Sequence, residues 1–290
     1  MKDICVIFYH KNAFLFKPQW IRKCIESIKQ QTFNDFDVLE LNYDQTNKQL
    51  FEGSIFENKI LTNHVKAMNH LIEKARNLGY KYIFNTNIDD YYSINRIEEQ
   101  MKYLKDYDMV SSDHECIKEK NGTTIVISSF KNSSLDVKEN LIANNNIIPH
   151  PCTAWNVSFF DDLSYENEIP EEDMRLWQRA LKNNKTIFIV PKVLLYYRIH
   201  DNQITQMTQK TNQTIMGECI LDFLHCFEKS TKTFLRWSDI MRIFKSWWLK
   251  FHSEKKLPTD YDVRKIMDST LGDPIPRRGW FIKMRSDYEW

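Results

Sequence analysis

The segment Asn87-Ile88-Asp89-Asp90 carries the most informative side chains of this 290-residue chain. It directly follows the polar end of a short apolar run, Tyr82–Phe84. Two adjacent carboxylates repel each other unless a cation or donor groups compensate their charge. Mg²⁺ or Mn²⁺, which prefer oxygen ligands and also bind phosphates, would do so. A solvated turn whose acidic residues cap the next helix is the alternative, although Ser93 is expected to cap that helix. From these residues alone, both interpretations stay open.

A second acidic group, Glu171-Glu172-Asp173, opens a predicted helix that contains Trp177. Acidic side chains stabilise a helix N-terminus through the helix dipole, and the residues alone favour that explanation. The catalytic alternative is that Asp173 acts as a general base and removes a proton from a hydroxyl group.

Two further segments contain side chains that could take part in binding or catalysis. The strand-like run that ends at Arg198 and His200 places both side chains on one face, within reach of a phosphate or a metal ion. The loop around His150 is stiffened by a proline on each side. Trp155 follows it, and its ring suits either stacking on a sugar or, more commonly, core packing.

The first half of the chain alternates apolar runs with amphipathic helical stripes. The expected strands are Ile4–Phe8, Val38–Leu41, Tyr82–Phe84 and Met109–Ser111, and the helical stripes between them include Trp20–Ile28, Val65–Ala75 and Ile94–Leu104. Gly79 is expected to follow the end of the second helix. This order predicts an α/β fold with a mostly parallel central sheet flanked by helices. Because ligands bind beyond the carboxyl ends of such strands, Tyr9–Asn12, Asp44–Thr46 and Asn87–Asp90 are expected to share one rim.

The pattern changes after residue 113. We expect a strand at 124–128, a helix at 135–146, a helix around Trp177 and two strands at 187–190 and 193–198. Beyond residue 210 the apolar spacing becomes helical. We therefore expect a catalytic domain at 1–210 and a helical C-terminal extension at 211–290. The extension pairs Trp247 and Trp248 with several lysines, which fits a membrane-surface helix, a dimer contact or packing against the first domain.

Bulk properties narrow the class of protein. A net charge of +1 gives no reason to expect nucleic acid as a partner. The six cysteines show no zinc-ligand spacing, and the longest apolar stretch, Ile187–Ile199, is too short to cross a bilayer. A strand pattern begins almost at once, which leaves no room for a signal peptide. We expect a cytoplasmic protein with reduced thiols, peripheral to a membrane if the extension binds one.

Taken together, these segments resemble the family-2 glycosyltransferases of the GT-A fold. The resemblance covers about residues 3–206 in four blocks that keep the family's order and spacing: SIKQQTFNDFDVLELNYD, YIFNTNIDDYY, HPCTAWN and EEDMRLWQRALKNNKTIFIVPKVLLYYRIHDNQIT. The last block is the most specific, because it contains the family's Glu-Asp-x-x-Leu-Trp-x-Arg and Tyr-Arg-x-His. The resemblance implies a GT-A-type domain that moves a sugar from a nucleotide-diphosphate sugar, by family habit a UDP-sugar, to an acceptor hydroxyl with inversion.

The resemblance also implies roles for individual residues. Asp173 would be the general base. The donor nucleotide and its diphosphate would be held by Tyr9, His10, Asp44, Asn87 and Arg198. A Mn²⁺ or Mg²⁺ ion would be held by Asp89, Asp90 and His200. The acceptor, which is a glycan, a protein or a lipid-linked molecule, would be held by His150, Trp155 and Glu172.

This chain departs from the family at three positions. Asn87 replaces the first Asp of the acidic run, Met68 replaces an Arg, and Gln45 replaces the Gly of the turn after the second strand. Two rival functions follow: a GT-A-like module that binds nucleotide sugars without turnover, and a sugar nucleotidyltransferase. The second usually needs a Gly-rich loop after the first strand, whereas this chain has Tyr9-His10-Lys11-Asn12 there.

Overall fold

The computed structural model describes residues 2–120, 122–142, 145–166, 172–200, 203, 235–236 and 281–282. The chain divides into two compact units, Met1–Asn202 and Gln203–Trp290. In the second unit, the described strands β10 (Leu235–Arg236) and β11 (Phe281–Ile282) form an antiparallel pair. The predicted boundary at residue 210, the helical extension and its membrane or dimer contacts otherwise lie outside the described residues.

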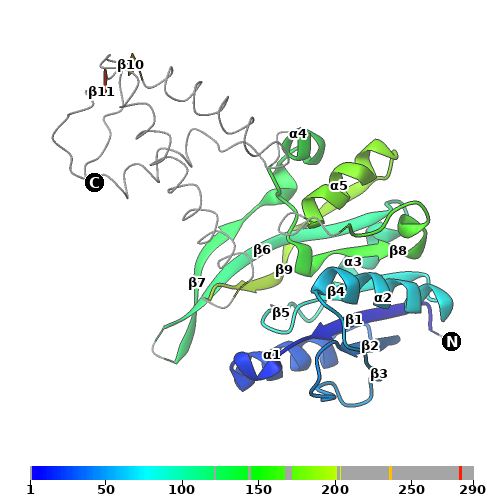
Figure 1. Ribbon diagram of the computed structural model, residues 1–290. Helices are drawn as coiled ribbons and strands as arrows, with labels where there is room; N and C mark the ends of the chain where they lie inside the picture. The colour runs from blue at the N-terminus through cyan, green and yellow to red at the C-terminus, as the bar shows by residue number, and fades with distance from the viewer. Residues whose placement is uncertain are drawn as a thin grey trace, which may run out of the picture. The chain divides into compact units, whose positions relative to one another are not determined.

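The first unit is built on a nine-stranded sheet with the order β3-β2-β1-β4-β8-β6-β9-β5, and β7 pairs with β6 outside this path. The strands are β1 (Ile4–His10), β2 (Phe36–Asn42), β3 (Ile55–Asn58), β4 (Tyr82–Thr86), β5 (Tyr91–Tyr92), β6 (Met109–Lys120), β7 (Thr123–Phe130), β8 (Ala154–Asn156) and β9 (Ile187–Arg198). The pairings make β1, β2, β3, β4, β6 and β9 run in one direction, whereas β5, β7 and β8 run in the other. The predicted mostly parallel sheet is confirmed, and Figure 1 shows the β6–β7 pair extending as a long arm.

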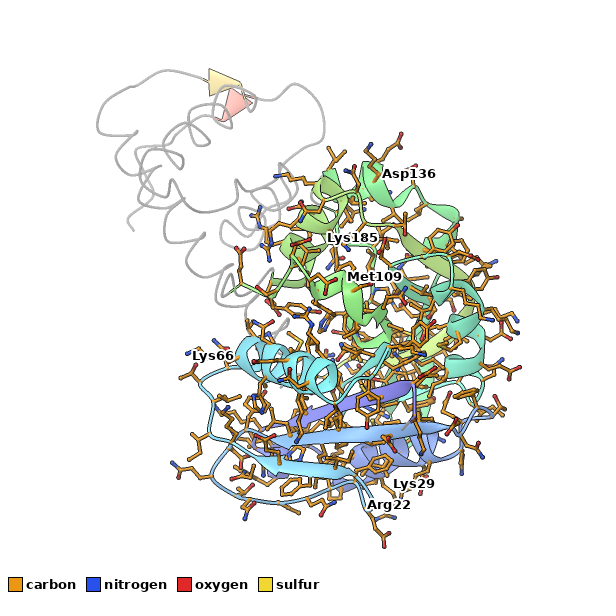
Figure 2. The ribbon with its side chains drawn as sticks, turned by 90° about the vertical axis from the view of Figure 1, so that its right-hand side faces the viewer. Arg22, Lys29, Lys66, Met109, Asp136 and Lys185 are labelled. Atoms are coloured by element: carbon orange, nitrogen blue, oxygen red, sulfur yellow. The ribbon has the colours of Figure 1, made fainter. Side chains whose placement is uncertain are left out.

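Helices cover both faces of this sheet. The helices are α1 (Pro18–Lys29), α2 (His64–Asn77), α3 (Arg96–Leu104), α4 (Val137–Ile142) and α5 (Glu172–Lys182), with 3₁₀ turns at Ala13–Leu15, Asn132–Ser134, His150–Cys152 and Val157–Phe160. Buried residues of α2 and α5 share one core cluster, and those of α1 and α3 share the other. Figure 2 marks α2 by Lys66 and α1 by Arg22 and Lys29, on opposite sides of the strands. The alternating side chains of β1 feed both clusters, as a doubly covered strand requires.

The ends of the helices follow from local sequence. The Asn63 side chain caps α2 by accepting a hydrogen bond from the Lys66 N–H at 3.0 Å. Gly79 follows the end of α2 with φ +80°, as predicted. The prediction for Ser93 is corrected, because the N-cap of α3 is Asn95. Ser93 supports this turn differently, since its backbone oxygen accepts the Arg96 N–H at 3.1 Å.

Some elements differ from the sequence-based expectation. The two strands expected around Pro191 form one strand, β9, because the pairing with β6 passes from Val190–Ser112 to Val193–Asp113. Pro191 lacks an N–H, and this register shift removes the need for one. Strands β3, β5 and β8, of two to four residues, were not predicted, and α4 is shorter than the helix expected at 135–146. Among the described helices, none has the length and apolar character needed to cross a membrane.

Candidate active site

The carboxyl ends of β1, β2 and β4 form one rim, as the sequence predicted. The Asn12 N–H, after β1, donates to Asp44 Oδ2, after β2, at 2.5 Å. The Tyr9 hydroxyl, at the end of β1, donates to Asn87 Oδ1, after β4, at 3.2 Å. Segments more than 30 residues apart in sequence therefore meet at this edge of the sheet.

Asp44 accepts hydrogen bonds from the loops that follow β1 and β2. Besides Asn12, the backbone N–H of Thr46 donates to Asp44 Oδ1 at 2.7 Å. Burial alone would raise the pKa of Asp44, but the hydrogen bonds from Thr46, Asn12 and Asn42 outweigh it and lower the pKa. Asp44 is therefore charged at neutral pH and fixes the loops that follow β1 and β2.

His10 does not face the rim, which corrects its predicted contact with the nucleotide. Its side chain is buried, with Nε2 3.0 Å from Glu40 Oε1, and its ring packs edge-on against Phe8 and lies on the α1 side of the sheet. Successive side chains of a strand point to opposite faces, so Tyr9 reaches Asn87 while His10 cannot. His10 supports the strand from within the core.

The turn after β4 holds the two predicted metal carboxylates. Asp90 is buried, and its Oδ1 accepts the Arg198 N–H at 2.7 Å. Asp90 Oδ2 is also buried, and it has no hydrogen-bond partner among the described residues. Burial, together with the neighbouring Asp89 carboxylate, raises the pKa of Asp90 well above its ordinary value. Asp89 is more accessible, and its Oδ2 lies 2.9 Å from His200 Nε2. Arg198 and His200 thus both contact this turn from the end of β9.

Arg198 supports this turn from its buried side. The prediction that its side chain holds the donor diphosphate is therefore corrected. Its side chain is 3% exposed, and Nε donates to the Asp89 backbone oxygen at 2.8 Å. The guanidinium lies 4.9 Å from the Trp20 ring centroid, and Nη1 lies 3.7 Å from Glu119 Oε1. Glu119 also accepts hydrogen bonds from Trp20 Nε1 and from Lys17 Nζ. Trp20 and Glu119 were missed in the sequence, where nothing links α1 or the β6–β7 arm to Arg198.

The residues of this turn fit a divalent cation, although the described part of the chain offers no ready-made set of ligands. Among the described residues, no three His, Cys, Asp or Glu side chains are arranged to hold a metal ion. Mg²⁺ commonly takes only one or two carboxylates from a protein, and waters and substrate phosphates complete its shell. The Asp89 carboxylate, which is 14% exposed, and the buried Asp90 Oδ2 provide oxygens of this kind.

The start of α5 brings a second pair of carboxylates. Asp173 Oδ1 accepts the Met174 N–H at 2.7 Å, and Oδ2 accepts Asn146 Nδ2 at 3.0 Å. Burial and then the charge of Glu172 raise the pKa of Asp173 to about 6. A carboxylate with this pKa is mostly ionised at neutral pH, yet it binds a proton more readily than an ordinary Asp, which suits a general base.

Glu172 is held by a residue that sequence reasoning did not single out. Its Oε1 lies 2.6 Å from Nε2 of His64, the first residue of α2. Its Oε2 is buried and has no hydrogen-bond partner among the described residues. Burial would raise the pKa of Glu172, but the hydrogen bond and charge of His64 outweigh it and lower the pKa. Glu172 is therefore a fixed negative charge beside Asp173.

His150 and Trp155, both predicted to hold the acceptor, have different surroundings. His150 Nε2 lies 2.9 Å from the Tyr165 hydroxyl, and burial lowers the pKa of His150 to about 4. Trp155 is 0% exposed and packs against Phe160 and Trp177 in the core. The sugar-stacking role of Trp155 is therefore corrected, because a fully covered ring cannot stack on a ligand.

Tyr9 connects the two acidic groups. Its pKa is raised well above the ordinary value, first by burial and then by nearby ionisable groups that include Tyr43, Glu172 and Asp89. The charges of Asp89, in the turn after β4, and of Glu172, at the start of α5, thus both act on the Tyr9 hydroxyl. The ends of β1 and β4 therefore meet at Tyr9 and Asn87, and Glu172 at the start of α5 lies near enough for its charge to act on Tyr9.

Comparisons with known proteins extend the description of the fold. No protein-family model matches the chain, and no curated protein does. Solved structures of S. aureus TarS residues 1–349 are similar to this chain. For one of them the sequence identity is 15% and the TM-score is 0.52, and the match covers 93% of this chain and 72% of the TarS chain. The complex with UDP has 14% identity and TM-score 0.51, covering 94% and 72%. The complex with UDP-GlcNAc has 12% identity and TM-score 0.53, covering 93% and 80%.

The chain spans 44% of the length of a longer TarS structure, with 15% identity, TM-score 0.49 and 88% of this chain covered. Identities this low show a shared fold and leave the chemistry to the residues themselves. The chain therefore has the TarS fold, an α/β domain with a mostly parallel central sheet flanked by helices.

Proposed function

We propose that the chain is a metal-dependent inverting glycosyltransferase that moves a sugar from a UDP-sugar to an acceptor hydroxyl. The observation that carries this proposal is the place of Tyr9, which donates a hydrogen bond to Asn87 and lies near the charges of Asp89 and of Glu172. Glu172 directly precedes Asp173, whose pKa is about 6. The fold it shares with TarS structures that contain UDP or UDP-GlcNAc supports the choice of donor.

The donor would lie along the rim. Asp44 is a charged acceptor of hydrogen bonds beside the loop after β1, and the bases and riboses of nucleotides offer donors for such a group. Asn87, whose Oδ1 is bonded by Tyr9, would meet the ribose or the diphosphate with a neutral side chain. In this arrangement the sugar would lie toward Glu172 and Asp173.

Asp89 and Asp90 would hold Mn²⁺ or Mg²⁺ together with the donor phosphates, with His200 bonded to Asp89. When bound, such an ion supplies positive charge that offsets the charge developing on the leaving diphosphate. Arg198 keeps the Asp89 backbone in place from the buried side. Its contribution is therefore to position the turn.

The acceptor side follows from Asp173. Asp173 takes the proton of the acceptor hydroxyl as the hydroxyl oxygen attacks the anomeric carbon. The bond between that carbon and the diphosphate oxygen breaks, and the nucleoside diphosphate leaves with the electron pair. Because attack and departure occur on opposite faces, the anomeric centre is inverted. Glu172, fixed by His64, would orient the acceptor.

A thermal-shift screen of nucleotide sugars, with and without Mn²⁺, tests the donor and the metal together. A ligand that binds only the native state raises the melting temperature by mass action. We expect the largest rise with UDP-sugars in the presence of Mn²⁺. Equal melting temperatures with and without every nucleotide sugar would contradict the proposal. Binding without hydrolysis or transfer would identify the chain as a nucleotide-sugar binding module.

A further inference from the structure

Helix α2 contacts two residues on the acceptor side, which are Glu172, the first residue of α5, and Tyr165. At the first, His64 Nε2 lies 2.6 Å from Glu172 Oε1, and the side chains are 12% and 14% exposed. At the second, the Asn69 side chain bonds the backbone of Tyr165 twice. Asn69 Nδ2 donates to the Tyr165 oxygen at 2.7 Å, and the Tyr165 N–H donates to Asn69 Oδ1 at 3.0 Å.

These contacts fall on either side of the residues that precede the carboxylates. Tyr165 lies seven positions before Glu172, and Asp173 is the next residue. The Tyr165 hydroxyl also lies 2.9 Å from His150 Nε2, so fixing Tyr165 fixes a second side chain near the site. A bidentate amide–backbone contact and a charge-assisted hydrogen bond are both directional, and together they define a position better than packing alone.

We propose that His64 and Asn69 are positioning residues, which hold Glu172 and Tyr165 and thereby set the place of Glu172 and Asp173. This inference deepens the proposed function and rests on it. His64 occupies Glu172 Oε1 and leaves Oε2 for the acceptor hydroxyl, while Asp173 follows as the neighbouring residue of the same helix turn.

The two contacts also connect the donor side with the acceptor side. Helix α2 packs against β1 and β2, whose carboxyl ends carry Tyr9 and Asp44. Through His64 and Asn69, the same helix fixes the start of α5. The distance between donor and base is therefore set by one rigid element, and small misplacements of a reacting group lower rates strongly.

The test uses four variants of the full chain: H64A, H64Q, N69A and the control H70A. His70 lies on the same helix and also pairs with a glutamate, with Nε2 2.9 Å from Glu57 Oε1. The hydrogen bonds around this pair go to Lys59 and Lys74, whereas His64 bonds the first residue of α5. With Mn²⁺ and UDP-GlcNAc, hydrolysis measured as UDP release gives kcat and KM. We expect H64A and N69A to lower kcat at least tenfold with KM within about twofold.

Two measurements separate a positioning role from general destabilisation: the recovery of kcat in H64Q and the amide hydrogen exchange of Tyr165. H64Q retains a donor for Glu172 and should recover most of the kcat lost in H64A, whereas H70A should match the unsubstituted chain. N69A should speed amide hydrogen exchange of Tyr165 at least tenfold, because its N–H loses Asn69 Oδ1. Unchanged kcat in H64A and N69A, or equal losses in H64A and H64Q, would overturn the inference.

The exchange measurement also separates the two proposals. If the unsubstituted chain neither binds nor hydrolyses UDP-GlcNAc with Mn²⁺, the proposed donor fails, and the exchange of Tyr165 and of the first turn of α5 still decides whether α2 holds Tyr165 and Glu172. Unchanged exchange in both H64A and N69A would overturn the positioning role even in an active enzyme.

Discussion

His200 Nε2 lies 2.9 Å from Asp89 Oδ2, although 111 residues separate the two in the sequence. The His200 ring is also enclosed by aromatic rings, with centroid distances of 4.9 Å to Trp20 and 5.8 Å to Phe16. The predicted metal residues are therefore bonded to each other, and Asp89 is oriented before any ligand arrives. Because Asp89 is held in this orientation, its substitution is the most direct test of the proposed metal site.

Asp89→Asn keeps the shape of the side chain but removes its charge. We expect Mn²⁺-dependent affinity for UDP-GlcNAc to fall roughly tenfold or more, because a neutral amide is a weaker ligand than a carboxylate. Isothermal titration calorimetry measures this. The control is Asp161→Asn, at an exposed position paired with Arg76 at 3.3 Å. An Asp89→Asn protein that binds as tightly as the unsubstituted chain would remove Asp89 from the metal site.

Arg198→Lys tests the support beneath that turn. Lysine keeps the charge but loses the Nε bond to the Asp89 oxygen and the planar contact with Trp20. We expect donor affinity with Mn²⁺ to drop by about 10–100-fold, as is typical when the groups that orient ligands are changed. Arg22→Lys on the exposed side of α1 (Figure 2) serves as the control. Full affinity in Arg198→Lys would show that the turn holds its place alone.

Asp173→Asn should separate binding from chemistry. Removal of a general base typically costs ~10²–10⁴-fold in rate, whereas UDP-GlcNAc binding should remain nearly intact. The pH profile gives a second measurement. A base with a pKa of about 6 is active when deprotonated, so the rate should rise as pH increases through about 6 and level off above it. Turnover in Asp173→Asn close to the normal rate would exclude the base role.

His150 predicts a dependence of stability on pH. Its folded pKa of about 4 lies below the ordinary 6.5, so between pH 6.5 and 4 the unfolded chain binds a proton that the native chain does not. Stability from this group is complete above pH 6.5 and is lost as pH falls toward 4, by at most about 1.4 kcal/mol per pH unit. Urea unfolding at pH 7.5, 6 and 5 should show a steeper loss for the unsubstituted chain than for His150→Gln. Parallel losses would contradict the assignment.

Glu40 predicts a large effect on stability without a role in chemistry. It accepts the Leu50 and Phe51 N–H groups at 2.5 and 3.1 Å and the Ser54 hydroxyl at 2.6 Å, with His10 Nε2 3.0 Å away. Glu40→Ala leaves these buried groups without their acceptor, and unfolding should become easier by about 3–5 kcal/mol.

The control for this prediction lies on the surface nearby. Glu52 is 95% exposed and lies 3.7 Å from Lys29, so Glu52→Ala should change the unfolding free energy by less than about 0.5 kcal/mol. Chemical denaturation monitored by circular dichroism compares the two variants. Similar stability of both would show that water enters and replaces the buried acceptor.

The sequence predicted the sheet and the rim because periodic apolar runs and polar strand ends are local signals. Tyr9, Asp44 and Asn87 were placed at one edge by this logic, and the hydrogen bonds among their segments agree. The same reasoning did not predict β8, a three-residue strand whose only apolar residues are Ala154 and Trp155. Short strands take their place from neighbours already formed, and their own residues carry little pattern.

The side chains that support the site were harder to predict than those that form it. Trp20, Glu119 and His64 contact Arg198 or Glu172 only because distant elements pack together, and no spacing in the sequence encodes that. The direction of a side chain was the other limit. Arg198 and Trp155 were predicted to contact ligands, but both side chains are buried among other side chains.

The span of the site contacts has a consequence for folding. Glu172 meets His64 across 108 residues, and His200 meets Asp89 across 111. Contacts this far apart close large loops, so they form after the local helices and hairpins have ordered. The sheet has pairings of comparable span, such as Tyr91 of β5 with Tyr196 of β9, so this edge and the site contacts should close together and late. Refolding should then show a delay between the recovery of helical circular dichroism and the protection of the β5 and β9 amide groups against hydrogen exchange.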